Sequence, residues 1–289
     1  MKVLLWVLAG IVVLVFAECI REVNSFRVTR YRISSPKLQR VKRRKMILLS
    51  DLHNCSYGKK NAALLRAIRK EQPDLILVAG DMLVGSKKKS PRVAEELMKE
   101  LPKVCDTFCA NGNHEQRYRN HQEVVDMDYK TYKKQLTDAG VHYLENEQAS
   151  LMWEDCKVQI YGLEIPNEAY NKFQQTSLPN GYMEETLGAA EASAYTILIA
   201  HNPVYMEEYL NWGADLIVSG HFHGGIARIP FWRGVITPQG GLFPKYSGEH
   251  TKVGNQDVVV SKGIGIHTFK IRFLNPAEVV VLEVGDSEE

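Results

Sequence analysis

Two histidines stand one residue apart in the segment SGHFHGG, residues 219–225. They follow the apolar run ADLIVSG, which is typical of a buried strand that ends in a tight turn. Residues i and i+2 of an extended chain point to the same side, so His221 and His223 can face one site together. Neutral imidazoles are common metal ligands, although an isolated His-x-His is as often an ordinary loop. The neighbouring glycines Gly220, Gly224 and Gly225 let the backbone come close to whatever is bound.

Ligand-type side chains also follow four other apolar runs: MILLS, LILVAG, TFCA and YTILIA. In chain order these residues are Asp51, His53, Asp81, Asn113, His114, Glu115 and His201. A carboxylate at a single strand end is usually a turn residue. Polar groups at the carboxyl ends of several strands, however, converge on one edge of an α/β sheet. The five strand ends together therefore predict one metal-binding site.

Strand-like and helix-like segments alternate along most of the chain. Helical patterns at 61–72, 93–101 and 124–140 separate the apolar runs, and further strand-like runs follow toward the C-terminus. This alternation is typical of a layered α/β protein. We expect one catalytic domain over residues 46–286, preceded by a basic linker at 21–45 and a hydrophobic segment at 1–20.

The composition excludes several classes of protein. A chain of 289 residues with 45% hydrophobic and 24% charged residues is long enough for a sizeable core. Its net charge of +2 is too small to favour nucleic acid as a partner. The five cysteines are odd in number and form no CxxC pair, so they do not indicate a disulfide framework.

The N-terminus is expected to meet a membrane. An uncharged apolar run of fifteen residues, from Val3 to Ala17, is short for a spanning helix but long for a signal-peptide core. A retained single-pass anchor in the cell membrane is favoured over a cleaved signal or a buried helix. The arginines after the segment favour a cytoplasmic main domain, whereas the basic cluster at 42–45 could instead lie against anionic headgroups. The side of the membrane stays open.

The motifs D-x-H, G-D, G-N-H-E, a lone H and G-H-x-H, in this order, resemble the calcineurin-like metallophosphoesterases. The resemblance covers nearly the whole chain after the anchor and implies an α/β/β/α sandwich with its metal site at the carboxyl ends of the strands. TRYRISSPKL, GHFHGGIARIP and KGIGIHTFKIRFLNPAEVVVLEV resemble a membrane-associated bacterial branch. Some relatives in that branch hydrolyse the pyrophosphate link of a UDP-diacylglucosamine lipid. Ile226 departs from the glutamine expected after the paired glycines.

The resemblance implies two divalent or trivalent metal ions that share the carboxylate of Asp81. One ion would also be held by Asp51, His53 and His223. The other would be held by Asn113, His201 and His221. Mixed nitrogen and oxygen donors suit manganese, iron or zinc.

The resemblance assigns acid catalysis to the G-N-H-E motif. His114 would face the leaving-group oxygen and donate a proton or a hydrogen bond to it. Glu115 would orient that ring through its other nitrogen, as carboxylates beside catalytic imidazoles commonly do.

The sequence thus predicts a two-metal phosphodiesterase at a membrane surface, with a metal-bridging hydroxide as nucleophile. Its substrate would be a phosphoester, with a lipid or a nucleotide-linked lipid among the candidates. A phosphomonoesterase of the same family and a catalytically silent metal-binding scaffold are the alternatives. The intact Asp81 and His114 argue against the scaffold. A nuclease ranks low because the segment at 181–195 is acidic and small rather than basic and aromatic.

Overall fold

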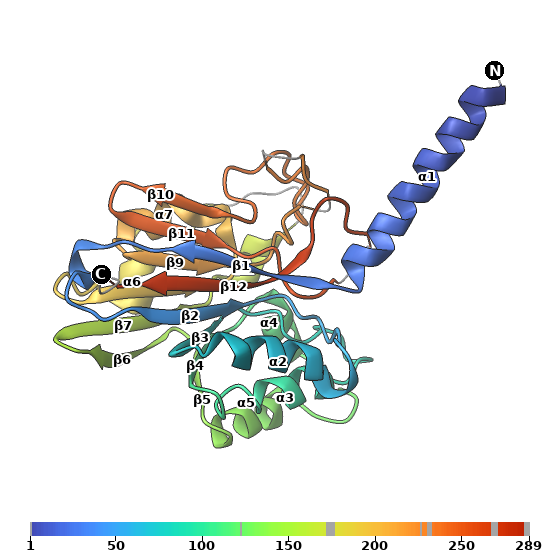
Figure 1. Cartoon of the computed structure of the whole chain (residues 1–289). Helices are drawn as coiled ribbons and strands as arrows, with labels where there is room; N and C mark the ends of the chain where they lie inside the picture. Colours follow the sequence, from blue (N-terminus) through green and yellow to red (C-terminus); the bar gives the residue numbers. More distant parts are fainter. Residues whose placement is uncertain are drawn as a thin grey trace.

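The computed structural model describes residues 2–121, 123–171, 177–225, 227–229, 233–266 and 271–285. Two six-stranded sheets pack against each other, and helices cover both outer faces (Figure 1). The predicted α/β/β/α layering is confirmed.

The first sheet has the strand order β1-β12-β2-β3-β4-β5. Strands β2 to β5 run parallel to one another, and β12 runs antiparallel to β2. The strands are β1 (Phe26–Arg32), β2 (Arg44–Leu49), β3 (Leu75–Val78), β4 (Asp106–Ala110), β5 (Val141–Leu144) and β12 (Ala277–Val284). The helices between them are α2 (Ala62–Glu71), α3 (Arg92–Met98), α4 (Asn113–Arg119) and α5 (Tyr129–Asp138).

The second sheet has the order β10-β11-β9-β8-β7-β6, and β7, β8, β9 and β11 are parallel. Its strands are β6 (Glu147–Trp153), β7 (Cys156–Leu163), β8 (Tyr195–Ala200), β9 (Leu216–Ser219), β10 (His250–Val253) and β11 (Gln256–Val260). Helices α6 (Tyr182–Leu187) and α7 (Met206–Trp212) contribute Met183, Leu210 and Trp212 to the core on its outer face.

The central strands are largely apolar because both of their faces are buried. In β2, Ile47 and Leu49 pack toward the helices, while Met46 and Leu48 pack between the sheets. Successive side chains of a strand point to opposite faces, so a strand between two layers needs an unbroken apolar run. The residue that follows each apolar run therefore lies where the strand ends, at the edge of the sheet.

The segment predicted as a linker, 21–45, contains the edge strand β1. This strand pairs in parallel with β12 over its whole length. Phe26 and Val28 pack against the core, and the arginines alternate with them, so half of the strand stays in solvent. The sequence did not predict this strand because its arginines interrupt the apolar pattern. The domain limits remain a prediction, and residue 286 lies outside the described residues.

Among the described residues, one helix, α1 (Lys2–Val23), is long and apolar enough to cross a membrane by length and composition. It extends away from the sheets, and its apolar side chains are exposed (Figure 1). A signal sequence has the same features, so α1 is a candidate membrane anchor.

Candidate metal centre

The structure brings the predicted site residues together at the carboxyl-terminal edge of both sheets. Asp51 and His53 follow β2, Asp81 follows β3, Asn113 and His114 begin α4 after β4, His201 follows β8, and His221 and His223 follow β9. Almost all of these side chains are buried, and the His223 ring is the most exposed. Three groups among them have ligand atoms close enough to hold a metal ion: Asp51–His53–His223, Asp81–His201–His221 and His53–Asp81–His114.

In the first group, three potential ligand atoms face one another. The Nε2 atoms of His53 and His223 lie 3.1 Å apart. Asp51 Oδ1 lies 3.5 Å from His223 Nε2 and 3.9 Å from His53 Nε2. Two imidazoles and a carboxylate at these distances can close around one cation.

Asp81 stands between the first group and the second. Its Oδ2 atom lies 3.2 Å from His201 Nε2 and 3.8 Å from His53 Nε2. His221 Nε2 and Asn113 Oδ1 are buried at the same edge, and neither has a hydrogen-bond partner within the part of the chain that the structure describes. Buried polar atoms without partners are costly, so these two atoms point to a ligand.

The donor set fits a cation. His201 Nδ1 lies 2.5 Å from the carbonyl oxygen of Ala79 and can donate to it, which directs the Nε2 lone pair toward the Asp81 carboxylate. Burial alone lowers the pKa of His201, but the nearby charge of Asp81 outweighs it and raises that pKa to about 10. Either a proton or a metal ion must therefore neutralise this contact.

The two histidines of GHFH are kept neutral. Burial, and then the positive charge of His201, lowers the pKa of His221 to about 3. Burial also holds the pKa of His223 well below its usual value. Neutral imidazoles bind metals without first losing a proton.

Five of the predicted ligands lie on left-handed backbone. They are Asp51, His53, Asp81, His221 and His223, with φ between 47° and 64°. Residues with side chains rarely adopt this conformation, and it concentrates at functional sites where the surroundings enforce it.

Glycines make room for the carboxylates rather than for the imidazoles. A Cβ atom on Gly220 would meet Asp51 Oδ2 at 2.4 Å, and one on Gly112 would meet Asp81 Oδ1 at 2.2 Å. Gly224, which we expected to let the backbone come close to a bound group, instead approaches Asn275. No other residue type fits these positions without displacing a carboxylate.

The His114 ring has a defined hydrogen-bonding state. Its Nδ1 atom accepts a hydrogen bond from the N–H of Gly85 at 2.8 Å. An accepting Nδ1 places the ring proton on Nε2. That Nε2 lies 4.0 Å from Asp81 Oδ2, so the donor faces the metal centre.

The predicted contact between Glu115 and His114 is wrong. The Nδ1 atom that Glu115 was expected to bind is taken by Gly85. The Glu115 carboxylate accepts backbone N–H groups instead, from Asp81 (2.8 Å), Met82 (2.8 Å), Leu83 (3.3 Å) and Gly112 (3.0 Å). Burial, and then the charge of Asp81, raises the pKa of Glu115 to about 7. This residue therefore holds the loop that carries Asp81 and does not orient the ring.

The loop before β12 completes the site and was not among the predicted site residues. The N–H groups of Ile264 and Gly265 bond to the carbonyl oxygens of Ser50 and Asp51. The buried Arg272 donates to the carbonyl oxygens of Lys262, Gly263 and Gly265 and so shapes this loop. The only hint in the sequence was the glycine-rich stretch KGIG. Ile226 lies outside the described residues.

A cavity of about 450 Å³ lies beside the second group. Phe222, between the two histidines of GHFH, forms part of its wall together with Met206, Gln239, Leu242 and Tyr246. Gln239 accepts a hydrogen bond from Asn202, the residue after His201. The cavity is therefore continuous with the ligand loops and has a mixed apolar and polar lining.

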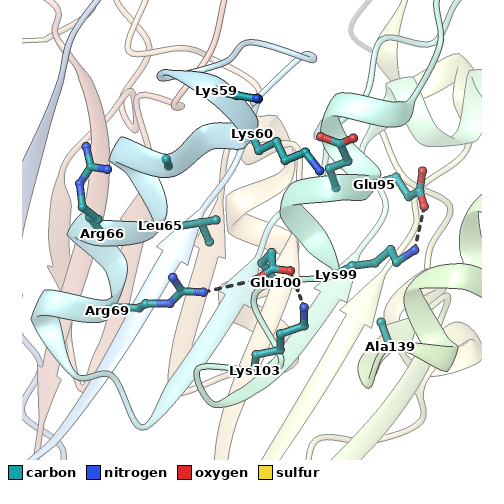
Figure 2. Close-up of a pocket in the computed structure, with 12 residues that line it drawn as sticks. Lys59, Lys60, Leu65, Arg66, Arg69, Glu95, Lys99, Glu100, Lys103 and Ala139 are labelled. Carbon is teal, nitrogen blue, oxygen red and sulfur yellow. Dashed lines mark hydrogen bonds and ion pairs between the residues drawn. The ribbon is translucent and has the colours of Figure 1, made fainter.

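A second, larger cavity of about 750 Å³ lies away from this edge, between α2 and α3 (Figure 2). Two of its acidic residues form ion pairs: Glu100 with Arg69 and Lys103, and Glu95 with Lys99 (Figure 2). None of the candidate metal-binding groups among the described residues lies there.

Comparison with known proteins identifies the family of this site. The family model for calcineurin-like phosphoesterases matches residues 44–225, which contain every predicted ligand. The chain belongs to this family. It is therefore a phosphoester hydrolase of a family that uses divalent metals.

Several relatives of this phosphoesterase cover most of its length. The metallophosphoesterase YkuE of Bacillus subtilis (strain 168) is 26% identical over 82% of this chain and 77% of its own. A metallophosphoesterase of Aquifex aeolicus (strain VF5) is 26% identical over 95% and 97%. The phosphodiesterase YaeI of Escherichia coli (strain K12) is 24% identical over 83% and 82%. The likeness to a UDP-diacylglucosamine hydrolase branch remains a prediction.

Proposed function

We propose that this phosphoesterase is a two-metal phosphodiesterase that acts at a membrane surface. The position of Asp81 carries the proposal, because one carboxylate oxygen faces His201 on one side and His53 on the other. A shared carboxylate is the natural way to hold two cations close together. The first ion would bind Asp51, His53, Asp81 and His223. The second would bind Asp81, Asn113, His201 and His221.

Bound metal ions in such a centre would withdraw charge from the phosphoryl oxygens and supply a hydroxide nucleophile at neutral pH. The protein itself supplies the proton on the leaving side. His114 holds its proton on Nε2, facing the site, because Gly85 donates to Nδ1. A donor held in this way can stabilise or protonate an alkoxide as it departs.

A diester is favoured over a monoester because the site has room for a second organic group. The cavity of about 450 Å³ adjoins the ligand loops, and its lining combines Phe222, Leu242 and Tyr246 with Thr237 and Gln239. Such a lining suits a group with both apolar and hydrogen-bonding parts. A lipid or a nucleotide-linked lipid has this character. The relative YaeI is named as a phosphodiesterase, which points the same way.

The test compares two soluble substrates. Protein loaded with manganese should hydrolyse bis-p-nitrophenyl phosphate with a higher kcat/KM than p-nitrophenyl phosphate, and should contain two ions per chain. A preference for p-nitrophenyl phosphate would instead indicate a phosphomonoesterase. Stoichiometric metal without hydrolysis of either ester would indicate a silent scaffold.

A further inference from the structure

The end of α1 is fastened to the loops of the metal centre. Glu22, in the last turn of α1, is only 1% exposed and accepts the backbone N–H of Asn275 at 2.8 Å. The side-chain amide of Asn275 donates to the carbonyl oxygens of His223 and Gly225, both at 2.7 Å. Three points of contact thus join the helix, the loop before β12 and the loop that carries two predicted ligands. The helix leaves the protein at the same edge at which the metal centre lies.

Exposed apolar side chains gather on the same loops. Outside α1, the described residues include seven large apolar side chains that are exposed. Five of them, which we name the apolar rim, lie between β9 and β12 and are 40% to 65% exposed: Ile229, Leu242, Phe243, Ile271 and Leu274. A soluble protein rarely gathers such side chains on neighbouring loops without a binding partner.

Backbone hydrogen bonds connect the loops of the apolar rim. The N–H of Arg228 bonds to Phe273, the N–H of Val235 to Ala227, and the N–H of Phe243 to Val235. In Figure 1 the red-orange loop before β12 reaches the base of α1, and the orange loops after β9 lie next to that loop. The segments that carry the rim residues are therefore hydrogen-bonded neighbours, and the segment before β12 is also bonded to the base of α1 through Asn275 and Glu22.

We propose that the apolar rim is a second membrane-contacting surface, which rests in the interface of the same bilayer that α1 enters. Its occupant is lipid rather than protein because the rim adjoins α1, which has an exposed apolar surface throughout. The exposed Arg27 at the junction suits anionic headgroups, whereas Arg21 is paired with Glu18. Apolar side chains of this kind enter about 5–10 Å into the boundary between headgroups and acyl chains. The inference rests on the proposed membrane function.

The contact would give a lipid substrate a short path to the metal centre. Leu242 belongs to the rim and also forms part of the wall of the cavity beside His221. A lipid phosphodiester could move from the interface past Leu242 into this cavity without leaving the bilayer surface. The metal centre would then act on headgroup bonds at the level of the interface.

Fluorescence quenching by brominated lipid tests the proposal in the full-length protein. The protein is placed in phosphatidylcholine–phosphatidylglycerol vesicles with and without bromine on the acyl chains. Leu242→Trp is compared with Met152→Trp, since Met152 is 61% exposed but lies in β6, away from the rim. The added emission of Leu242→Trp should fall to about half or less in brominated vesicles, while that of Met152→Trp should not change. Ile271→Trp provides a second probe of the rim if Leu242→Trp folds poorly.

Comparison with a Trp6→Phe variant gives the emission of Trp6 itself. That emission reports whether α1 is in the bilayer, independently of the rim. Trp6 lies in α1, so its emission should be quenched whenever the helix is in the bilayer. If Trp6 is quenched but neither rim probe is, the rim does not touch lipid and the proposal is overturned. If Trp6 is not quenched either, the anchor itself is wrong. Cross-linking of two chains through unquenched rim residues would assign the rim to a second copy and would also overturn the proposal.

Discussion

Replacing Glu115 by alanine should loosen the loop that carries the shared carboxylate. The Glu115 side chain accepts four buried backbone N–H groups, from Asp81, Met82, Leu83 and Gly112, at 2.8–3.3 Å. Each buried donor left without an acceptor costs about 1–3 kcal/mol. At about 1 kcal/mol for each of the four donors, the variant should lose roughly 4 kcal/mol of unfolding free energy. Water that enters the vacated space would keep the loss near this lower value.

Thermal unfolding of the metal-free protein measures the effect. One kcal/mol corresponds to about 2–4 °C in a domain of this size, so Tm should fall by roughly 8–16 °C. Metal content should fall as well, because Asp81 is no longer held in place. Glu115→Gln keeps one acceptor oxygen and should recover part of both losses. Glu96→Ala removes an exposed glutamate from α3 and should change neither.

A different result would support the role predicted from the resemblance, in which Glu115 orients the His114 ring. If Glu115 acted through the His114 ring, Glu115→Ala would keep its Tm and its metal content. It would then lose activity chiefly on esters with a poor leaving group, as a variant without the acid does. That combination would refute the reasoning from the four backbone donors.

Three further predictions follow from the metal centre. Asp81→Asn should abolish turnover and release metal from both groups, which metal analysis would show; two ions per chain at a normal rate would contradict the shared carboxylate. His114→Ala should keep its metal yet slow hydrolysis by roughly 10²–10⁴-fold on alkyl diesters and less on nitrophenyl esters, whereas equal losses would indicate phosphate binding. The pKa of His201 is raised from 6.5 to about 10, so in metal-free protein its stabilising effect is complete below 6.5 and is lost as pH rises through 10. Tm of the metal-free protein should therefore fall over this range, and less so in His201→Gln.

The ligand positions could be predicted because they depend on local pattern and on one rule of topology. An apolar run followed by Asp, Asn or His is visible in the sequence, and parallel strands bring such ends to one edge. The role of Glu115 was also visible in principle. It stands three residues after Gly112, the position at which a glutamate turns back to the backbone at the start of a helix.

Contacts between distant segments could not be predicted in this way. Glu22 and Asn275 are 253 positions apart, and no periodicity links them. Arg272 is surrounded by backbone carbonyl groups, which a sequence does not reveal. The edge strand β1 lacks an unbroken apolar run because only one of its faces is buried. These features depend on how complete loops pack, which is known only once the sheets are assembled.

The hydrogen bonds around the five left-handed ligands account for their unusual backbone conformation. A residue with a side chain loses about 1–3 kcal/mol in such a conformation, so the five ligands together store several kcal/mol of strain. Hydrogen bonds between the loops offset this strain. The N–H groups of Asp51 and His53 bond to the carbonyl oxygens of Gly80 and Asp81, and the N–H of His221 bonds to the Asp51 carboxylate across the two sheets. The ligands are thus held by contacts within the first sheet and by one contact that joins the two sheets at this edge. Metal binding then needs little rearrangement, and its free energy adds to the stability of the whole edge.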